Sequence, residues 1–191
     1  MEPVREDPRV ARTREAVGRA TLQVLAERGY AGFTVEAVAD EARVARSTIY
    51  RHWPTRIALI SDALDALNRQ PRPDRDEVAG GARAKVEVLV THLTEAFTDS
   101  LLSSCMPALV EAAEHEPEVA AFLHGYSATR RATLVRVLEA GIASGELPSH
   151  LDPELASVAL AGAVAYYRTM TPEPLPTERA ADLVTQVLGP P

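Results

Sequence analysis

Residues 34–59 read TVEAVADEARVARSTIYRHWPTRIAL, and their pattern decides the fold. A short helix is predicted over 35–42, with Thr34 as its N-cap, because a threonine hydroxyl at this position accepts a backbone N–H. Residues 43–45 form a tight connection, and a second short helix follows over 46–53. Two short helices joined by a three-residue turn and preceded by a longer helix are typical of a helix-turn-helix unit.

Helical spacing of apolar residues continues on both sides of this stretch, and no strand-like alternation persists. The chain is therefore predicted to be all-α, with about nine helices in total. Pro107 is expected to break or kink the chain, and the proline-rich residues 69–76 to join the first four helices to the rest. The other helices are predicted at about 8–28, 55–67, 78–98, 106–114, 117–144, 153–168 and 177–188.

Composition narrows the class of protein. The 191 residues are 46% hydrophobic and 25% charged, as in ordinary globular proteins. Cys105 is the single cysteine of the sequence, which excludes an intramolecular disulfide and a cysteine-based zinc site and fits a reducing cytoplasm. The sequence predicts neither a signal peptide nor a membrane-spanning segment.

The charge is distributed unevenly. Residues 1–56 contain ten arginines and eight acidic residues, a net of +2, whereas 57–191 carry a net of −9, which gives −7 for the chain. This asymmetry favours an anion-facing module at 1–56 that is followed by an acidic body at 57–191. The alternative is that both are solvated surfaces without a partner.

The outward side of the second short helix carries hydrogen-bond donors that suit DNA. Arg46, Ser47 and Thr48 lie at its N-terminal end, the part of a recognition helix that enters the major groove, and they are predicted to read bases. The helix N-termini at Thr34 and Thr55 present backbone N–H groups that favour phosphate. The further DNA-binding candidates are Thr34, Arg43, Tyr50, Arg51, His52 and Arg56.

Residues 9–60 resemble the DNA-binding domain of the tetracycline-repressor (TetR) family of bacterial transcriptional regulators. The resemblance rests on AERGY at 26–30, FTV at 33–35, AVA at 37–39 and STIYRHWPTRIAL at 47–59. In that family the matching positions contact DNA or fix the third helix, which implies these roles for Thr34, Tyr50, His52, Trp53 and Arg56. Trp53 is expected to pack rather than to stack on a base, and Tyr50 could equally belong to the core with its hydroxyl at the surface.

Three residues depart from the family pattern. Arg43 stands where the family has glycine, so either the arginine adopts the left-handed conformation, at a cost of about 1 kcal/mol or more, or the turn differs. Ala45 replaces a serine cap, at about 1 kcal/mol of local helix stability, and Ile57 replaces a glutamate. Arg43 is hypothesised to offset its cost by contacting a phosphate.

The resemblance implies that 1–56 form the DNA-binding domain and that 57–191 form an antiparallel helical domain for effector binding and dimerisation. An apolar cavity with a few polar groups is the usual form of a small-molecule site. The pocket candidates, each of which could instead be plain core, are Leu89, His92, Leu93, Phe97, Cys105, Met106, Leu109, Phe122, Tyr126 and Tyr167, with His124 and Arg130 as further polar contacts.

A homodimer is predicted to form through the last two helices of each subunit, which together would build a four-helix interface. Small residues on the helix at 153–168 let a partner helix approach closely. Packing within the chain is the alternative. The interface candidates are Ala156, Ala159, Gly162, Ala163, Tyr166, Leu183, Val184 and Val187.

Signals for catalysis, cofactors and metals are weak. The five histidines have no metal-ligand spacing with one another, and the acidic residues around His115 are better explained as a solvated turn. No glycine-rich phosphate loop or nucleophile elbow is present, and Cys105 is expected to be buried and inert. The expectation is a protein that is not an enzyme and has no cofactor.

The sequence as a whole is interpreted as a cytoplasmic one-component regulator, most often a repressor, without membrane attachment. As a homodimer it would bind a pseudo-palindromic double-stranded operator, and an unknown small-molecule effector would release it. The alternatives are a helix-turn-helix used as a protein-interaction module without DNA specificity, a helical enzyme, and an activator in place of a repressor.

Overall fold

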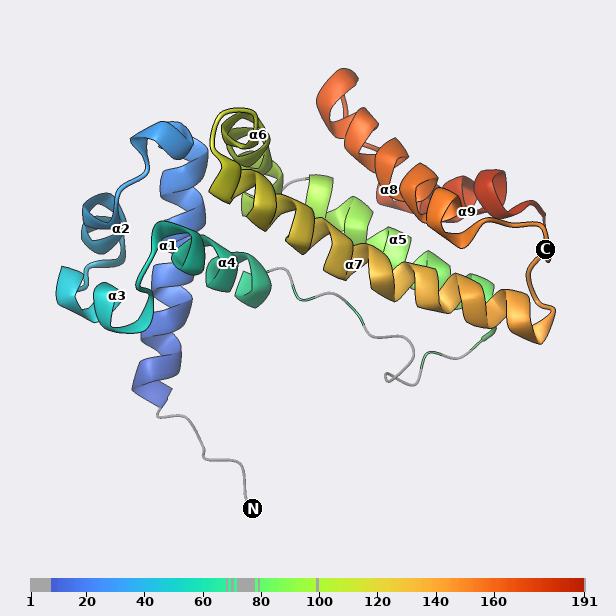
Figure 1. Ribbon diagram of the computed structural model, residues 1–191, viewed down its shortest axis with the longest axis horizontal. Coiled ribbons are helices and arrows are strands. Elements are labelled where there is room, and N and C mark those ends of the chain that lie inside the picture. Colours follow the sequence, from blue (N-terminus) through green and yellow to red (C-terminus); the bar gives the residue numbers. More distant parts are fainter. Residues whose placement is uncertain are drawn as a thin grey trace, which may run out of the picture. The chain divides into compact units, whose positions relative to one another are not determined.

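The computed structural model describes residues 8–67, 69, 71, 78, 80–98 and 100–190, and these contain nine α-helices, one 3₁₀ turn and no strand. The all-α prediction is confirmed (Figure 1). Most of the predicted joint, residues 70 and 72–76, lies outside the described residues. The helices are α1 (Pro8–Gly32), α2 (Val35–Ala42), α3 (Arg46–His52), α4 (Arg56–Leu67), α5 (Ala82–Thr98), α6 (Leu101–Ala113), α7 (Pro117–Ser144), α8 (Pro153–Met170), the 3₁₀ turn η1 (Thr177–Arg179) and α9 (Ala180–Leu188).

The chain divides into two compact units. The first unit comprises Met1–Arg69 and Ser104–Leu123, and the second comprises Gln70–Ser103 and His124–Pro191. The division therefore falls within α6 and α7, each of which contributes to both units.

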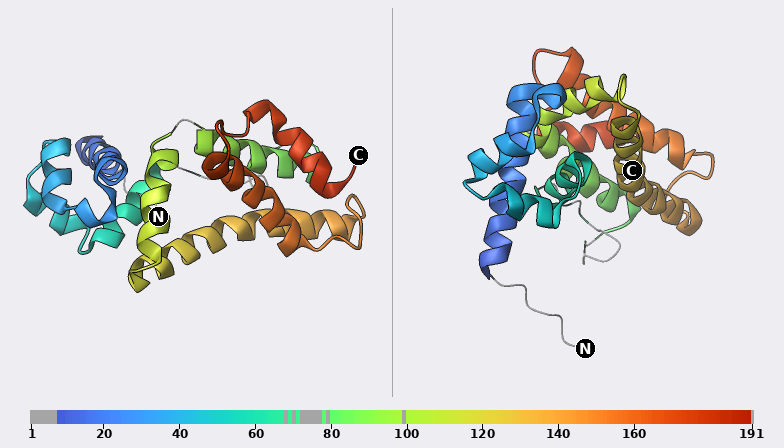
Figure 2. Two further views of the ribbon diagram at one scale, coloured as in Figure 1. Left: turned by 90° about the horizontal axis from the view of Figure 1, so that it is seen from above. Right: turned by 60° about the vertical axis from the view of Figure 1, so that its left-hand side comes forward.

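In the first unit, α1 packs against α4 and α2, and α2 packs against α3 (Figure 2). Gly18 of α1 lies at the contact with α4, where a Cβ built on it would be in ordinary van der Waals contact with Ala63, at 3.7 Å. Gly29 has a φ of 64°, which turns the chain at the end of α1 as its position predicted. The buried side chains of Phe33, Ile49 and Leu59 complete this small core.

The core of the second unit is built from α5, α7, α8 and α9. Val86, Leu138 and Leu160 are among its fully buried side chains. Helix α7 passes so close to the start of α5 that position 141 needs glycine, because a Cβ at this position would lie 2.4 Å from the Cβ of Ala82. Burial of this apolar surface is what holds the antiparallel helices together.

Two predicted helix boundaries were wrong. Helix α5 begins at Ala82 rather than near 78, because Gly80 has a φ of 110°, outside the helical region, and the Glu146 carboxylate accepts the Ala82 N–H at 2.7 Å. Helix α6 begins at Leu101 and continues through Pro107, where a break was expected. Long-range contacts of the Ser103 side chain and carbonyl, described below, support this proline inside the helix.

Candidate nucleic-acid interface

The turn between α2 and α3 is held by backbone hydrogen bonds. Arg43 adopts the left-handed conformation, with φ 55° and ψ 43°, and its N–H donates to the Asp40 carbonyl at 3.2 Å. The Val44 N–H donates to the Ala39 carbonyl at 3.0 Å. Arg43 therefore carries the predicted steric cost, of about 1–2 kcal/mol, at a position where glycine would be unstrained.

Helix α3 presents one face to the core and another to solvent. Ile49 is fully buried, and Trp53, directly after the helix, is 4% exposed. Tyr50 is 53% exposed, so its ring lies at the surface rather than in the core. Thr48 is half-buried. The exposed residues on this helix are Arg46, Ser47, Tyr50, Arg51 and His52.

Trp53 anchors the end of α3, as predicted for a packing residue. Its indole N–H donates to Asp62 of α4 at 2.9 Å, and Asp62 also pairs with Arg14 of α1 at 3.4 Å. The His52 ring packs edge-on against Trp53, with centroids 5.6 Å apart. These contacts fix the orientation of α3 relative to the two helices that support it.

Two helix N-termini meet beside Tyr50. The Thr34 hydroxyl accepts the Ala37 N–H at 3.1 Å, and the Thr55 hydroxyl accepts the Ala58 N–H at 3.1 Å, so both are N-caps as predicted. Between them lies an open hollow of about 280 Å³, lined by Phe33, Thr34, Val35, Glu36, Tyr50, Pro54, Thr55 and Arg56. Backbone N–H groups and the positive ends of two helix dipoles at one hollow favour an anion such as phosphate.

Arg56 is engaged inside the first unit. Its guanidinium lies 4.3 Å from the centroid of the Tyr30 ring and 5.8 Å from that of Phe33, and it donates to the Tyr30 carbonyl. Burial raises the pKa of Tyr30, and the nearby Arg56 charge partly opposes this shift. Arg56 thus ties the start of α4 to the end of α1, a contact that the sequence did not indicate. Its predicted contact with phosphate stays a prediction.

Comparison with known proteins agrees with this geometry. The family described as "Bacterial regulatory proteins, tetR family" matches residues 19–63, and that described as "Tetracyclin repressor-like, C-terminal domain" matches 77–187. The chain belongs to the TetR family of transcriptional regulators.

Individual relatives match most of the chain. The transcriptional regulator YdeS of Bacillus subtilis is 29% identical over 189 residues, which cover 96% of this chain and 92% of the relative. The repressor KstR2 of Rhodococcus jostii is 32% identical over 142 residues, 72% of this chain and 68% of the relative. Among solved structures, the fatty acid degradation regulator FadR of Bacillus halodurans has the same fold, with a TM-score of 0.77 at 22% identity over 91% of this chain and 97% of that one.

The predicted effector residues of this TetR-family chain fall in both compact units. Cys105, Met106, Leu109 and Phe122 belong to the first unit, and the other six belong to the second. Cys105 is fully buried, and burial raises its pKa to about 12, which fits the predicted inert thiol. The six in the second unit are Leu89, His92, Leu93, Phe97, Tyr126 and the more exposed Tyr167.

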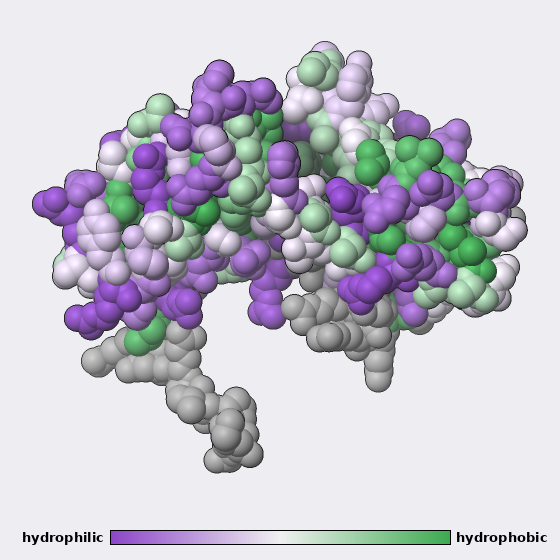
Figure 3. Space-filling model, viewed as in Figure 1, coloured by the Kyte–Doolittle hydropathy of each residue, from purple (hydrophilic) through white to green (hydrophobic). Residues whose placement is uncertain are grey.

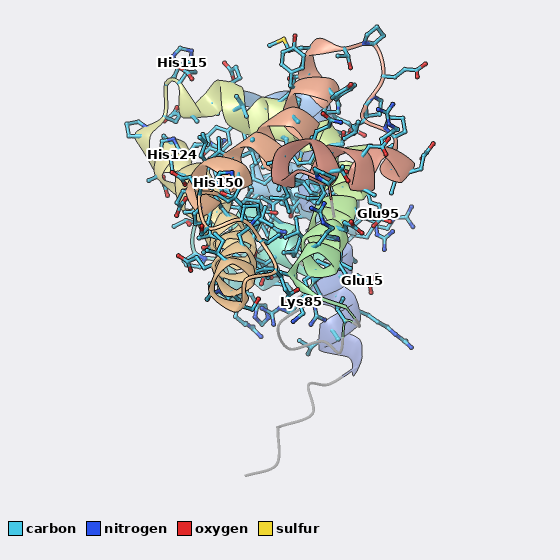
Figure 4. All side chains as sticks on the ribbon, turned by 90° about the vertical axis from the view of Figure 1, so that its right-hand side faces the viewer. Glu15, Lys85, Glu95, His115, His124 and His150 are labelled. Carbon is cyan, nitrogen blue, oxygen red and sulfur yellow. The ribbon has the colours of Figure 1, made fainter. Side chains whose placement is uncertain are left out.

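One arginine, one tyrosine and one histidine provide polar groups in the second unit. The Arg130 guanidinium of α7 stacks on the Tyr126 ring at 4.5 Å. His92 of α5 is half-buried, and its Nε2 has no hydrogen-bond partner among the described residues. Burial and the Arg130 charge lower the pKa of His92, and the charge of Glu95, three residues further along α5 (labelled in Figure 4), partly opposes them.

Arg168 of α8 forms hydrogen bonds with Ser103, which lies four residues before Pro107 in α6. Its Nε donates to the Ser103 hydroxyl, and its Nη2 donates to the Ser103 carbonyl at 3.2 Å. The Ser103 hydroxyl in turn donates to the Phe97 carbonyl at 3.0 Å. In a regular helix the Ser103 carbonyl would accept the N–H of residue 107, which Pro107 lacks. Sequence reasoning missed this pairing, because its partners are 65 residues apart.

The exposed side of α8 is apolar. Leu155, Val158, Tyr166 and Met170 are 50–70% exposed, and the predicted interface residues Ala159 and Gly162 are exposed on the same helix. Figure 3 shows apolar side chains grouped over α8 and its surroundings. The predicted Ala163, Leu183 and Val187 are partly buried.

Two of the predicted interface residues are buried inside the second unit. Ala156 and Val184 are 4% and 0% exposed and pack in the core of the second unit itself. Small and β-branched residues suit either environment, so the spacing alone did not separate the inner from the outer faces of α8 and α9. Val158 and Met170 are exposed residues of α8 that the prediction left out.

The described residues hold no group of three or more His, Cys, Asp or Glu side chains that could bind a metal ion. His115 lies on the exposed turn between α6 and α7 and points away from the helices (Figure 4). No helix in the described part of the chain is long and apolar enough to cross a membrane.

Proposed function

We propose that this TetR-family regulator binds a pseudo-palindromic operator as a homodimer, represses transcription in the cytoplasm, and is released by a small-molecule effector. The observation that carries the DNA-binding part is the convergence of Thr34, Tyr50 and the α4 N-terminus beside the exposed face of α3. These groups provide phosphate contacts that position Arg46, Ser47 and Thr48 in the major groove.

The DNA-binding role is tested by a matched pair of arginine substitutions. The probe is the duplex that the wild-type protein enriches from random-sequence DNA, and the dissociation constant is measured across a salt series. Arg51→Gln removes an exposed cation from α3 and is expected to weaken binding to all sequences and to reduce the salt slope by about 1. Arg136→Gln, on the exposed surface of α7, changes the net charge equally and is expected to leave the affinity for DNA and the salt slope unchanged. Equal behaviour of the two variants would contradict the proposed interface.

The homodimer is supported by the apolar face of α8. A monomeric soluble protein seldom leaves a contiguous apolar helix face in water, and Met170, 70% exposed, lies at one end of this face and Leu155 at the other. Because Ala159 and Gly162 are small, the α8 helices of two subunits can approach closely across a two-fold axis.

The effector site is proposed to involve the second unit, where Arg130 and His92 provide polar groups beside the apolar residues of α5. FadR of Bacillus subtilis, a structural neighbour at 20% identity with a TM-score of 0.74, was solved in complex with stearoyl-CoA. Long-chain acyl-CoA is therefore the first probe to add to the protein–DNA complex. An effector is expected to weaken DNA binding about 5- to 150-fold, and DNA must weaken effector binding by the same factor.

A further inference from the structure

An acidic residue stands on the surface that is proposed to face DNA. Glu36 lies in the first turn of α2, and its Oε1 pairs with Nη1 of Arg46, the first residue of α3, at 3.4 Å. The two side chains are 50% and 65% exposed, so the pair lies in solvent. Glu36 also lines the hollow that contains Thr34 and Tyr50.

The position of this carboxylate conflicts with simple anion binding. A negative charge beside a phosphate repels it, and at about 4 Å in water this repulsion amounts to about fivefold in affinity. Favourable interaction with the α2 dipole explains why an acidic residue suits the first turn, but it does not explain the pairing with Arg46.

The geometry of the pair suits base recognition. A guanidinium has three nitrogens, and Glu36 engages only Nη1 of Arg46. The edge formed by Nε and Nη2 presents two parallel N–H donors, which match the O6 and N7 acceptors of guanine. Holding one end of a long, flexible side chain reduces the rotamer entropy lost when this edge meets a base.

We propose that Glu36 is a positioning residue that orients Arg46 for guanine and at the same time repels DNA that offers no guanine at the matching place. This inference rests on the proposed function, since it assumes that α3 enters the major groove. Glu36 then lowers affinity for non-specific DNA and raises affinity for the operator, so it increases the ratio of the two.

The test compares Glu36→Ala with the wild-type full-length chain on two duplexes. One is the duplex enriched by the wild-type protein, and the other has the same length and composition in scrambled order. Glu36→Ala is expected to bind the scrambled duplex about threefold more tightly and the selected duplex about threefold more weakly, so the specificity ratio falls about tenfold. Substitution of single guanines in the selected duplex should then reduce the affinity of Glu36→Ala less than that of the wild type.

Two further variants separate orientation from charge. Glu36→Gln keeps an oxygen acceptor for Arg46 and is expected to retain part of the guanine preference while it binds scrambled DNA more tightly. Glu41→Ala removes a carboxylate from the same helix, about 140° around its axis from Glu36, and is expected to change neither affinity. In an Arg46→Ala background, Glu36→Ala should no longer alter the guanine preference. Thermal unfolding confirms that each variant is folded.

Several results would overturn the proposal. Equal tightening on both duplexes with an unchanged guanine preference would mean that Glu36 acts by charge alone. No change on either duplex would mean that Glu36 does not face DNA. An altered guanine preference that persists in the Arg46→Ala background would mean that Glu36 does not act through Arg46. If the wild-type protein enriches no sequence, the proposed function fails instead.

Discussion

Replacing Arg168 with alanine is expected to destabilise the protein by about 2–3 kcal/mol. The change removes two guanidinium hydrogen bonds to Ser103, one to its hydroxyl and one to its carbonyl at 3.2 Å. A hydrogen bond to a charged group contributes about 1.5–3 kcal/mol, and a partly buried carbonyl left without a partner adds to the loss. The measurement is urea unfolding at one fixed protein concentration, because the proposed subunit association would also contribute to stability.

The role assigned to Pro107 makes this prediction specific. Pro107→Ala supplies the N–H that a regular helix donates to the Ser103 carbonyl, so Arg168→Ala should cost about 1 kcal/mol less in that background. Arg136→Ala, a change on exposed surface, is expected to alter stability by less than about 0.5 kcal/mol. If Arg168→Ala costs the same with proline and with alanine at 107, within about 0.5 kcal/mol, then Arg168 does not compensate for the proline.

Three other variants test separate parts of the structure. Arg43→Gly is expected to raise stability by about 1 kcal/mol by relieving the left-handed arginine, and to weaken DNA binding with a salt slope reduced by about 1; an unchanged slope would exclude the phosphate contact. Hydrogen bonds from Ala82 and Ser144 lower the pKa of Glu146, so its stabilising effect is present above the usual value near 4.5 and is lost as the pH falls through the lower folded-state pKa. Acid titration of stability should therefore show a smaller loss for Glu146→Gln than for the wild type, and identical curves would argue against this cap. Gly162→Glu should give a monomer in analytical ultracentrifugation, whereas Gly125→Glu, where an added Cβ likewise has no described atom within 4 Å, should remain a dimer; two dimers would exclude the α8 face.

Local signals in the sequence predicted the helix-turn-helix part of the first unit well. The Thr34 cap, the left-handed Arg43 and the buried Trp53 each depend on residues within a few positions, or on a motif that fixes their order. Helix-turn-helix geometry follows from such short-range constraints, because capping and turn conformation are decided by neighbouring residues.

Contacts between distant residues could not be predicted in the same way. Glu146 caps α5 from 64 residues away, and Arg168 reaches Ser103 from 65 residues away. Neither pair has a spacing that marks it, since any exposed carboxylate or arginine could have been the partner. Pro107 was expected to interrupt α6 because the Arg168 guanidinium that bonds the Ser103 carbonyl is far away in the sequence.

The faces of α8 show a second limit. Ala156 and Ala159 are the same residue type, but Ala156 is buried in the core of the second unit and Ala159 is exposed. Alanine and glycine carry little hydropathy signal, so they do not show which face of α8 is buried. Leu155, Val158 and Met170 are exposed because the opposite face of α8 packs in the core formed with α5, α7 and α9.

Selection from random duplex DNA with the purified protein is the decisive test of sequence-specific binding by a symmetric pair of helix-turn-helix units. We expect enrichment of a pseudo-palindrome whose half-sites are separated by about one helical turn or a multiple of it, bound by two protomers with strong salt dependence. Enrichment of no sequence, by protein unfolded and refolded to remove any bound effector, would contradict it.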